Sequence, residues 1–543
     1  MNGRRIRKTI ALLASVVLLL VSTPASFAAE RAAQTSGKPP LLLVGVGDSL
    51  THGTMDATNN ATNTLHAYLQ KIAESLATVS TLTFSQPLFD AEENRLQPFQ
   101  IPTNLGVDGA DAFSVEGIEY YQRAGVETSY VTDEYLADAL LPFGFKDKYD
   151  KVFYPINLKV RKKASMVDST VWLLNQYAGQ GQPAVVFWVG NNDSSTAALG
   201  EGGKNPTFVP LPYEQVAPEL TPLVRTLLRE SEEAGDLSFE PYTPASIERN
   251  LTVLADFVAQ YDHLLARLKS EVSGAAGAKL FLLTLPYYSS VGYLFDSEDL
   301  EFYFRKVNPE YTVPPTFKRV APPGEPITDP TQGDRISLLT FGLMYALLDS
   351  GYSVEYVNEV LEIAGQQRDG LVLSEAEQAS IRARIDGFNA TIRAAAATYG
   401  SGAHVVEIGD FLNDRLTGKT PVVIGDKVLS RKWVRGNSFS LDGVHPNYTA
   451  QALIANFVLE TLNAVLGLTA PLYDLEAILG TDPYIDWDGD GFAPGPGYTA
   501  SGLAELLFLF KDPDDTSAEI QPVLPPDVWR LISNAILKEF LGG

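Results

Sequence analysis

Residues 41–53 read LLLVGVGDSLTHG, and this stretch decides how the rest of the chain is interpreted. Its apolar residues are nearly continuous rather than alternating, which is typical of a strand covered on both faces in a parallel sheet. The strand ends in a turn that carries an acid and a hydroxyl, Asp48 and Ser49. Ligands of open parallel sheets bind beyond the carboxyl ends of the strands, so Ser49 has a position suited to chemistry. Taken alone, the stretch fits equally well a polar turn whose side chains bond only to backbone groups.

Strand and helix patterns alternate along the chain after this first strand. Three long segments have apolar residues at helical spacing, namely 243–272, 375–400 and 447–467. Thr243 with Pro244 predicts the start of the first helix, and Gly400 and Gly467 predict the ends of the other two. Four further apolar runs predict strands: FQIPTNLGV (99–107), AVVFWVG (184–190), KLFLLTLP (279–286) and HVVEIGD (404–410). This alternation predicts an α/β fold in which a parallel sheet lies between two helical layers.

Composition limits the class of protein. The chain has 543 residues, of which 45% are hydrophobic and 20% charged, and this is typical of a globular protein. Its length exceeds what one core usually organises, so we expect a large domain with insertions or a second module. The net charge of −25 argues against a nucleic-acid partner and favours neutral substrates or cations.

The first 28 residues have the pattern of a secretory signal peptide. Four basic residues precede the apolar run TIALLASVVLLLV, which ends in the small-residue stretch TPASFAAE. The run is shorter than the roughly 20 residues that span a bilayer, so we expect cleavage after Ala28 rather than a membrane anchor. A polar linker, 29–39, would then begin a secreted or periplasmic protein without a stable membrane span. The chain has no cysteine, so neither disulfides nor a thiolate mechanism is available to it.

Three other segments place polar groups near predicted strand ends or before the last helix. NLGVDGAD (104–111) contains Gly109, and VGNNDSS (189–195) places Asn192 just after a strand. LDGVHPNYTAQ (441–451) places Asp442 three residues before His445. We expect these segments and Ser49 to meet at one edge of the sheet.

These residues supply the groups that acyl transfer requires. Ser49 is the candidate nucleophile, His445 the base and Asp442 the carboxylate that orients the imidazole. The N–H groups of Ser49 and Gly109, together with the Asn192 side chain, would form the oxyanion hole. The other four histidines are near Ser49 in sequence, on helical patterns or at the start of a strand, so we expect structural roles for His52, His66, His263 and His404. For Asp48 and Asp193 we also expect backbone capping rather than proton transfer.

The same residues resemble the SGNH, or GDSL, hydrolase family. Its four blocks occur in order as GDSL at Ser49, a glycine block at Gly109, GNND at Asn192 and DGVHP at Asp442 and His445. The resemblance covers residues 40–467. It implies a three-layer, flavodoxin-like fold with a five-stranded parallel sheet, and a secreted ester hydrolase that needs no cofactor for catalysis.

Large insertions, at about 85–165, 195–243 and 286–375, separate these blocks, and we expect them to determine substrate choice. The last contains the apolar helical run RISLLTFGLMYALLDSG, for which packing of a subdomain is a more frequent role than contact with substrate. A lipid or short-acyl ester is the expected substrate, and an acetylated carbohydrate is the alternative. An inactive hydrolase scaffold that serves as a surface binding protein is the alternative from another class.

The C-terminal extension, 468–543, contains the acidic stretch DWDGDG. Asp486, Asp488, Asp490 and Gly491 match positions 1, 3, 5 and 6 of a calcium-binding loop, but position 12 is Gly497 instead of glutamate. Both a structural calcium site and a solvated acidic turn therefore fit this stretch. A differently built site would recruit a later acid, namely Glu505, Asp512, Asp514 or Asp515.

Overall fold

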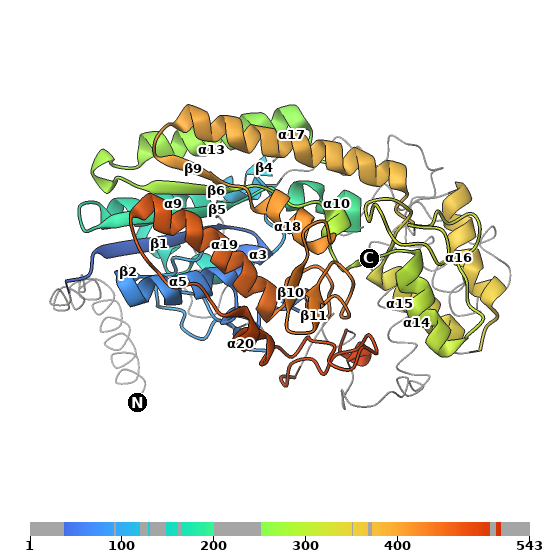
Figure 1. Ribbon diagram of the computed structural model, residues 1–543. Coiled ribbons are helices and arrows are strands. Elements are labelled where there is room, and N and C mark those ends of the chain that lie inside the picture. Colours follow the sequence, from blue (N-terminus) through green and yellow to red (C-terminus); the bar gives the residue numbers. More distant parts are fainter. Residues whose placement is uncertain are drawn as a thin grey trace, which may run out of the picture.

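The computed structural model describes residues 37–91, 94–119, 129–130, 148–160, 164–199, 251–349, 351–367, 372–499 and 507–511. Its centre is a five-stranded, fully parallel sheet (Figure 1). The sheet order is β2 (Thr81–Thr83), β1 (Pro40–Gly47), β5 (Gln182–Trp188), β6 (Lys279–Leu283) and β9 (Ala403–Val406). Counted in chain order this is 2-1-3-4-5, the order of flavodoxin-like sheets, in which the ligand crevice lies between the first and third strands. The predicted parallel α/β architecture is confirmed.

Helices cover both faces of this sheet. α9 (Met166–Tyr177), α13 (Leu254–Glu271) and α17 (Glu375–Tyr399) form one layer, and α13 runs beside α17 (Figure 1). α5 (Tyr68–Val79) and α19 (Tyr448–Leu466) pack together on the other face. As predicted, α17 ends at Gly400 and α19 at Gly467, whose φ of +66° favours glycine.

Further helices and strands surround this central body. The described residues also form α3 (Ser49–His52), α4 (Ala61–Thr64), η2 (Ser114–Glu116), β3 (Ile118–Glu119), β4 (Ser129–Tyr130), α7 (Lys148–Phe153), α8 (Ile156–Val160), α10 (Asn192–Leu199), η5 (Gly274–Ala276), η6 (Tyr288–Ser290), β7 (Leu294–Phe295), α14 (Ser297–Val307), β8 (Ile336–Ser337), α15 (Leu338–Asp349), α16 (Val354–Gln367), α18 (Ile408–Leu416), β10 (Val422–Ile424), β11 (Lys427–Leu429), α20 (Leu475–Leu479) and η7 (Phe508–Phe510).

The prediction of a strand at 99–107 is wrong. The second strand is instead β2, which pairs with the first residues of β1. Residues 103–107 continue along the same side of β1 through backbone hydrogen bonds to Gly45 and Gly47, but only one isolated bridge forms, between Gly45 and Asn104. This segment is irregular, yet it still delivers Gly109 to the carboxyl end of β1.

The predicted start of the helix at Thr243 and Pro244 lies outside the described residues, but the helix itself begins later than expected. α13 starts at Leu254, and Leu251, one of the apolar residues within the predicted helix 243–272, precedes it in a non-helical segment. There the Thr252 N–H donates to the Asp193 carbonyl at 2.9 Å. At residues 251–253, a tertiary contact with the segment after β5 therefore takes the place of the predicted helix.

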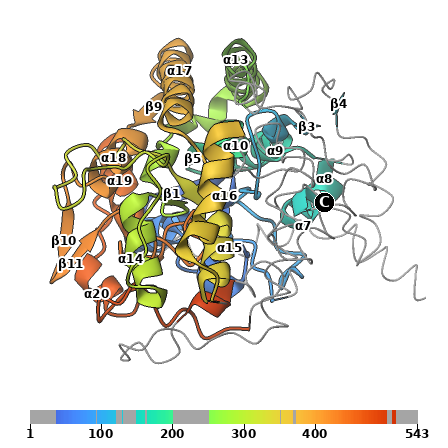
Figure 2. The ribbon, with the colours of Figure 1, turned by 90° about the vertical axis from the view of Figure 1, so that its right-hand side faces the viewer.

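The insertion at 286–375 forms a helical subdomain at one end of the molecule, where α14, α15 and α16 stand together (Figure 2). Its interior is aromatic, and the rings of Phe295 and Phe341 stack with centroids 4.3 Å apart. The apolar residues predicted to pack this subdomain are all buried, namely Leu338, Phe341, Met344, Tyr345 and Leu348. The packing role expected for α15 is thus confirmed.

The described part of the C-terminal extension packs against the same core. Tyr484, Ile485 and Phe492 are buried, and the Tyr303 hydroxyl donates to the Gly491 carbonyl at 2.9 Å. Among the described residues, one helix, α19, has the length and hydropathy of a membrane span. Because α19 is largely buried against α5, it is a core helix of the α/β body.

Candidate active site

Ser49 follows β1 at the carboxyl edge of the sheet. It is the first residue of α3, and the Asp48 carboxylate before it caps this turn by accepting the Leu50 N–H at 3.0 Å. Gly47 is required here because an added Cβ would lie 2.5 Å from the Trp188 carbonyl oxygen. β1 and β5 therefore approach closely where the first strand ends, and Ser49 begins the turn beyond it.

Asn192 follows β5, the neighbour of β1. Its Nδ2 donates to the Ala110 carbonyl at 3.1 Å, which ties the amide to the turn that contains Gly109. Gly109 has a φ of +68°, and its exposed backbone lines the same cavity as Asn192. The two predicted oxyanion donors from separate blocks therefore lie together.

Asp442 and His445 lie in the loop before α19. Their side chains are joined by a hydrogen bond of 2.7 Å between His445 Nδ1 and Asp442 Oδ2. The other carboxylate oxygen, Oδ1, accepts the backbone N–H groups of Val444 and His445, each at 2.9 Å. Burial opposes ionisation of Asp442, but the facing imidazole and the N–H donors outweigh burial and lower its pKa. An ionised Asp442 holds the proton of the imidazole on Nδ1 and leaves Nε2 as the basic nitrogen.

Ser49, Gly109, Asn192 and His445 line one cavity of about 240 Å³. Thus the four sequence blocks, which span almost four hundred residues, contribute to a single site at the switch point of the sheet. The rest of its wall is mainly apolar, with Leu50, Leu199, Pro286, Tyr287, Tyr288, Val291, Leu412, Leu416, Phe439, Val444, Pro446, Ala450, Leu453 and Ile454. An apolar group of a ligand fits this wall, and the polar residues of the lining include Ser49, Asn192 and His445.

The described residues of the three insertions contribute a few side chains to this wall, and the role of the insertions in substrate choice stays a prediction. Among the described residues of 286–375, those that line the cavity lie between Pro286 and Val291, whereas the buried residues of α15 do not line it. The insertion at 85–165 contributes Asp108 and Gly109, and that at 195–243 contributes Leu199. Residues 200–243 lie outside the described part of the chain.

The acids flanking the motifs have the capping roles that were expected. Asp193 Oδ2 accepts the Ala112 N–H at 2.9 Å. Asp48 Oδ2 accepts Asn191 Nδ2 at 2.9 Å, and burial raises the pKa of Asp48 to about 6. These contacts link the ends of β1 and β5 and hold the Ser49 and Asn192 turns together.

The remaining histidines do not line the cavity. His52 Nδ1 lies 2.9 Å from the Gly106 carbonyl, and the His66 ring stacks on Tyr448 at 3.6 Å. His263 Nε2 is 2.9 Å from Glu116 Oε1, and His404 belongs to β9. The choice of His445 among five histidines therefore agrees with the geometry.

Sequence reasoning missed Tyr288 and Asn191. The Tyr288 hydroxyl donates to the Asn191 carbonyl at 2.7 Å, and both residues line the cavity. Tyr288 comes soon after β6, so the rule that ligands bind at strand ends pointed to it.

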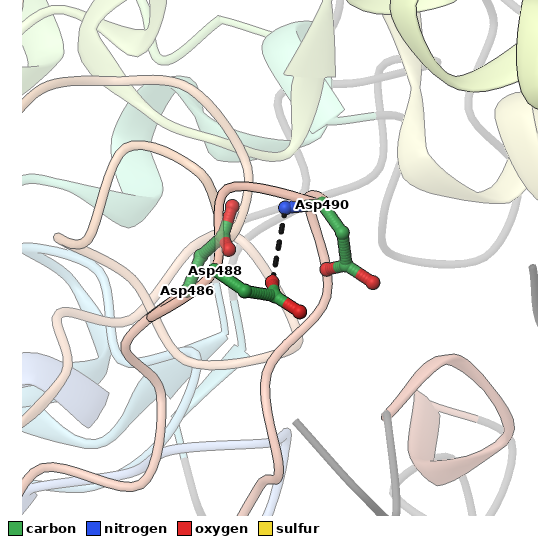
Figure 3. Close-up of side chains that lie close together, drawn as sticks. All are labelled: Asp486, Asp488 and Asp490. Carbon is green, nitrogen blue, oxygen red and sulfur yellow. Dashed lines mark hydrogen bonds between the residues drawn. The ribbon is translucent and has the colours of Figure 1, made fainter. Parts of the chain in front are cut away.

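The acidic loop of the extension is separate from this cavity: Asp486, Asp488 and Asp490 are not among the residues that line it. One carboxylate oxygen from each of Asp486, Asp488 and Asp490 lies within 4.8 Å of the others (Figure 3). Several of these oxygens already accept backbone N–H groups, such as that of Asp490 on Asp488 Oδ1 at 3.1 Å. Gly497, at the twelfth position, has no side-chain ligand, and the four later acids of the extension are outside the described residues. The donor set is suited to a hard cation but is incomplete, so the calcium site stays a prediction.

Comparison of the chain with family models, curated proteins and solved structures returns no match.

Proposed function

We propose that this protein is a serine ester hydrolase of the SGNH type. The observation that carries the proposal is that His445, which is held by Asp442 through a hydrogen bond of 2.7 Å, lines the same cavity as Ser49. A buried carboxylate, an imidazole and a hydroxyl at a strand end are the groups that nucleophilic acyl transfer needs.

In the proposed mechanism, His445 Nε2 takes the proton of the Ser49 hydroxyl as its oxygen attacks the ester carbonyl. The N–H groups of Ser49 and Gly109 and the Asn192 amide stabilise the tetrahedral oxyanion. The protonated imidazole then gives its proton to the leaving alcohol, and an acyl-enzyme remains on Ser49. Water, deprotonated by His445, attacks the acyl-enzyme and releases the carboxylic acid.

The apolar wall supports an acyl ester as the substrate. The cavity of about 240 Å³ is smaller than the roughly 300–1,000 Å³ of sites for drug-sized ligands, so a short acyl chain fits it best. An acetylated carbohydrate would instead need polar groups that bind its ring hydroxyls. The feature that favours a carbohydrate is the pair of aromatic side chains in the cavity wall, Tyr287 and Tyr288. Hydrolysis of a series of p-nitrophenyl esters and of acetylated sugars separates the two substrates.

Ser49→Ala is the direct test of the mechanism. Ester hydrolysis should fall to the background rate, whereas Ser290→Ala, which removes another hydroxyl from the same cavity, should retain it. The Ser290 hydroxyl donates to Asn413 Oδ1 at 2.9 Å and has no part in the proposed mechanism. Equal activity of Ser49→Ala and the wild type would eliminate Ser49 as the nucleophile.

We also propose that the protein acts outside the cytoplasm, on the basis of the signal-peptide pattern at 1–28. These residues lie outside the described part of the chain. The N-terminal sequence of the exported protein should begin at Ala29, and an N-terminus that retains the apolar run would refute cleavage.

A further inference from the structure

A second buried carboxylate, Asp56, lies next to the candidate triad and has no part in the proposed mechanism. Asp56 Oδ2 accepts the hydroxyls of Tyr484 at 2.5 Å and Tyr498 at 2.7 Å. Its Oδ1 accepts the Leu441 N–H at 2.9 Å. Burial, with a further contribution from the Asp442 charge, raises the pKa of Asp56 to about 6, so these donors offset an unfavourable position for a carboxylate.

The backbone at Asp56 has an unusual conformation. Asp56 and Ala57 have φ values of +53° and +54°, in the left-handed region that L residues seldom adopt. Two such residues in succession persist only where the surroundings hold them. This conformation directs the Ala57 N–H to Asp442 Oδ2 at 2.8 Å, the same oxygen that binds His445 Nδ1.

Asp56 holds the triad loop at a second point. Its backbone N–H donates to Ser440 Oγ at 3.1 Å, and its carboxylate binds the next residue, Leu441. The turn at 56–57 therefore fixes three consecutive residues, Ser440, Leu441 and Asp442. A shift of this turn would move the carboxylate that orients His445.

Both tyrosines that hold Asp56 come from the C-terminal extension, more than four hundred residues away in sequence. Their hydroxyls are themselves oriented by Asn63, whose Nδ2 donates to the Tyr498 hydroxyl at 2.7 Å and whose Oδ1 lies 3.3 Å from that of Tyr484. Tyr448, at the start of α19, also donates to Asn63 Oδ1 at 3.1 Å. The network thus connects the extension, the turn and the helix that comes after His445.

We propose that the C-terminal extension is part of the active-site architecture, with Tyr484 and Tyr498 as positioning residues that hold Asp442 through Asp56 and Ala57. The catalytic consequence rests on the proposed ester hydrolysis, but the positioning itself is independent of it. The extension is then not an appended module, since the hydrogen bonds that align the triad carboxylate depend on it.

The test compares Tyr484→Phe, Tyr498→Phe and the double variant with Tyr473→Phe in the full chain. Tyr473 belongs to the same extension and also donates its hydroxyl, to the Lys71 carbonyl at 2.8 Å, but it does not contact Asp56. Each single variant should lower kcat for a p-nitrophenyl ester about 10-fold, and the double variant about 100-fold, as expected for a misplacement of about 1 Å. KM should stay within about two-fold of the wild type, because the cavity wall is unchanged. Tyr473→Phe should have wild-type kcat.

A second readout does not depend on catalysis. The proton on His445 Nδ1, hydrogen-bonded to Asp442, should give a far-downfield proton resonance that Ser49→Ala and Tyr473→Phe retain. In Tyr484→Phe and Tyr498→Phe this resonance should broaden or move upfield, because the carboxylate is no longer held. If Tyr484→Phe fails to fold, Tyr498→Phe alone tests the proposal, because Tyr498 is only half-buried.

The outcomes separate the two proposals. A wild type without hydrolysis, but with a resonance that responds to the Tyr484 and Tyr498 substitutions, refutes the enzyme and supports the positioning. Wild-type kcat and an unchanged resonance in the folded double variant refute the positioning and leave the hydrolase proposal intact. A loss of kcat in Tyr473→Phe equal to that in Tyr498→Phe would show a general effect of the extension on stability and would also overturn the proposal.

Discussion

Substitution of Asp442 by asparagine replaces one carboxylate oxygen of the triad with an NH₂ group, and the hydrogen bonds of Asp442 determine its effect. The carboxylate accepts four N–H donors, two on each oxygen. Oδ1 accepts the backbone N–H groups of Val444 and His445. Oδ2 accepts the backbone N–H of Ala57 and the imidazole Nδ1–H of His445. An amide has only one acceptor oxygen, so in either orientation its NH₂ group faces two donors.

The less costly orientation keeps the amide oxygen on the two adjacent backbone N–H groups. The NH₂ group then faces His445 Nδ1, which must become an acceptor, and the imidazole proton moves to Nε2. That tautomer has no lone pair for the Ser49 proton. We expect kcat to fall about 10⁴-fold, as for the corresponding substitution in serine proteases, which is about 5.5 kcal/mol of transition-state stabilisation.

The assay is hydrolysis of p-nitrophenyl acetate, with circular dichroism to confirm folding. Asp168→Asn is the matched control, because Asp168 is also a hydrogen-bonded carboxylate but serves the capping box of α9 and an ion pair with Arg267 at 2.9 Å. The control should lose stability without a comparable loss of kcat. A folded Asp442→Asn enzyme with more than about a tenth of wild-type kcat would refute the tautomer argument.

Four more predictions concern the oxyanion hole, the pH dependence, the cavity and the acidic loop. Asn192→Ala should lower kcat about 100- to 1,000-fold with little change in unfolding temperature, and full activity would exclude Asn192 from the oxyanion hole. Activity should fall toward acid as His445 gains a proton and ceases to be a base, whereas Asp442, whose pKa is lowered, stays ionised there; a kcat/KM that does not fall from about pH 8 to about pH 5 would contradict the role of His445 as the base. Val291→Trp, which fills part of the cavity, should slow hydrolysis of longer acyl esters more than that of acetate, and an equal effect on all chain lengths would show that acyl groups lie elsewhere. Calcium at 100 times its dissociation constant should raise the free energy of unfolding by about 2.7 kcal/mol in the wild type but not in Asp488→Asn, and no increase in the wild type would refute the calcium site.

The central architecture was predictable because buried parallel strands have a strong sequence pattern. β1, β5 and β6 are continuous apolar runs, and all three appear close to the predicted positions. β2 was not found, since three residues, Thr81–Thr83, are too few for a pattern to form. The segment 99–107 is apolar for another reason, namely that it packs beside β1 without forming a regular ladder.

The candidate site was predictable to the extent that its residues follow strand ends or belong to compact motifs. The hydrogen bond between Asp442 and His445 is local, and their spacing indicated it. The contacts of Asp56 with Tyr484 and Tyr498 join distant segments and have no local pattern. Ala57 has a positive φ that its residue type disfavours, so only the tertiary structure reveals its hydrogen bond to Asp442.

The proposed mechanism depends on Ser49 being activated by His445, and covalent labelling by a fluorophosphonate measures this most directly. Intact mass should increase by one adduct, the modified peptide should contain Ser49, and the labelling rate should fall to background in His445→Ala and Ser49→Ala. Well-folded wild-type protein that takes up no label, or that is labelled equally fast in His445→Ala, would contradict the mechanism and favour a binding protein on an inactive hydrolase scaffold.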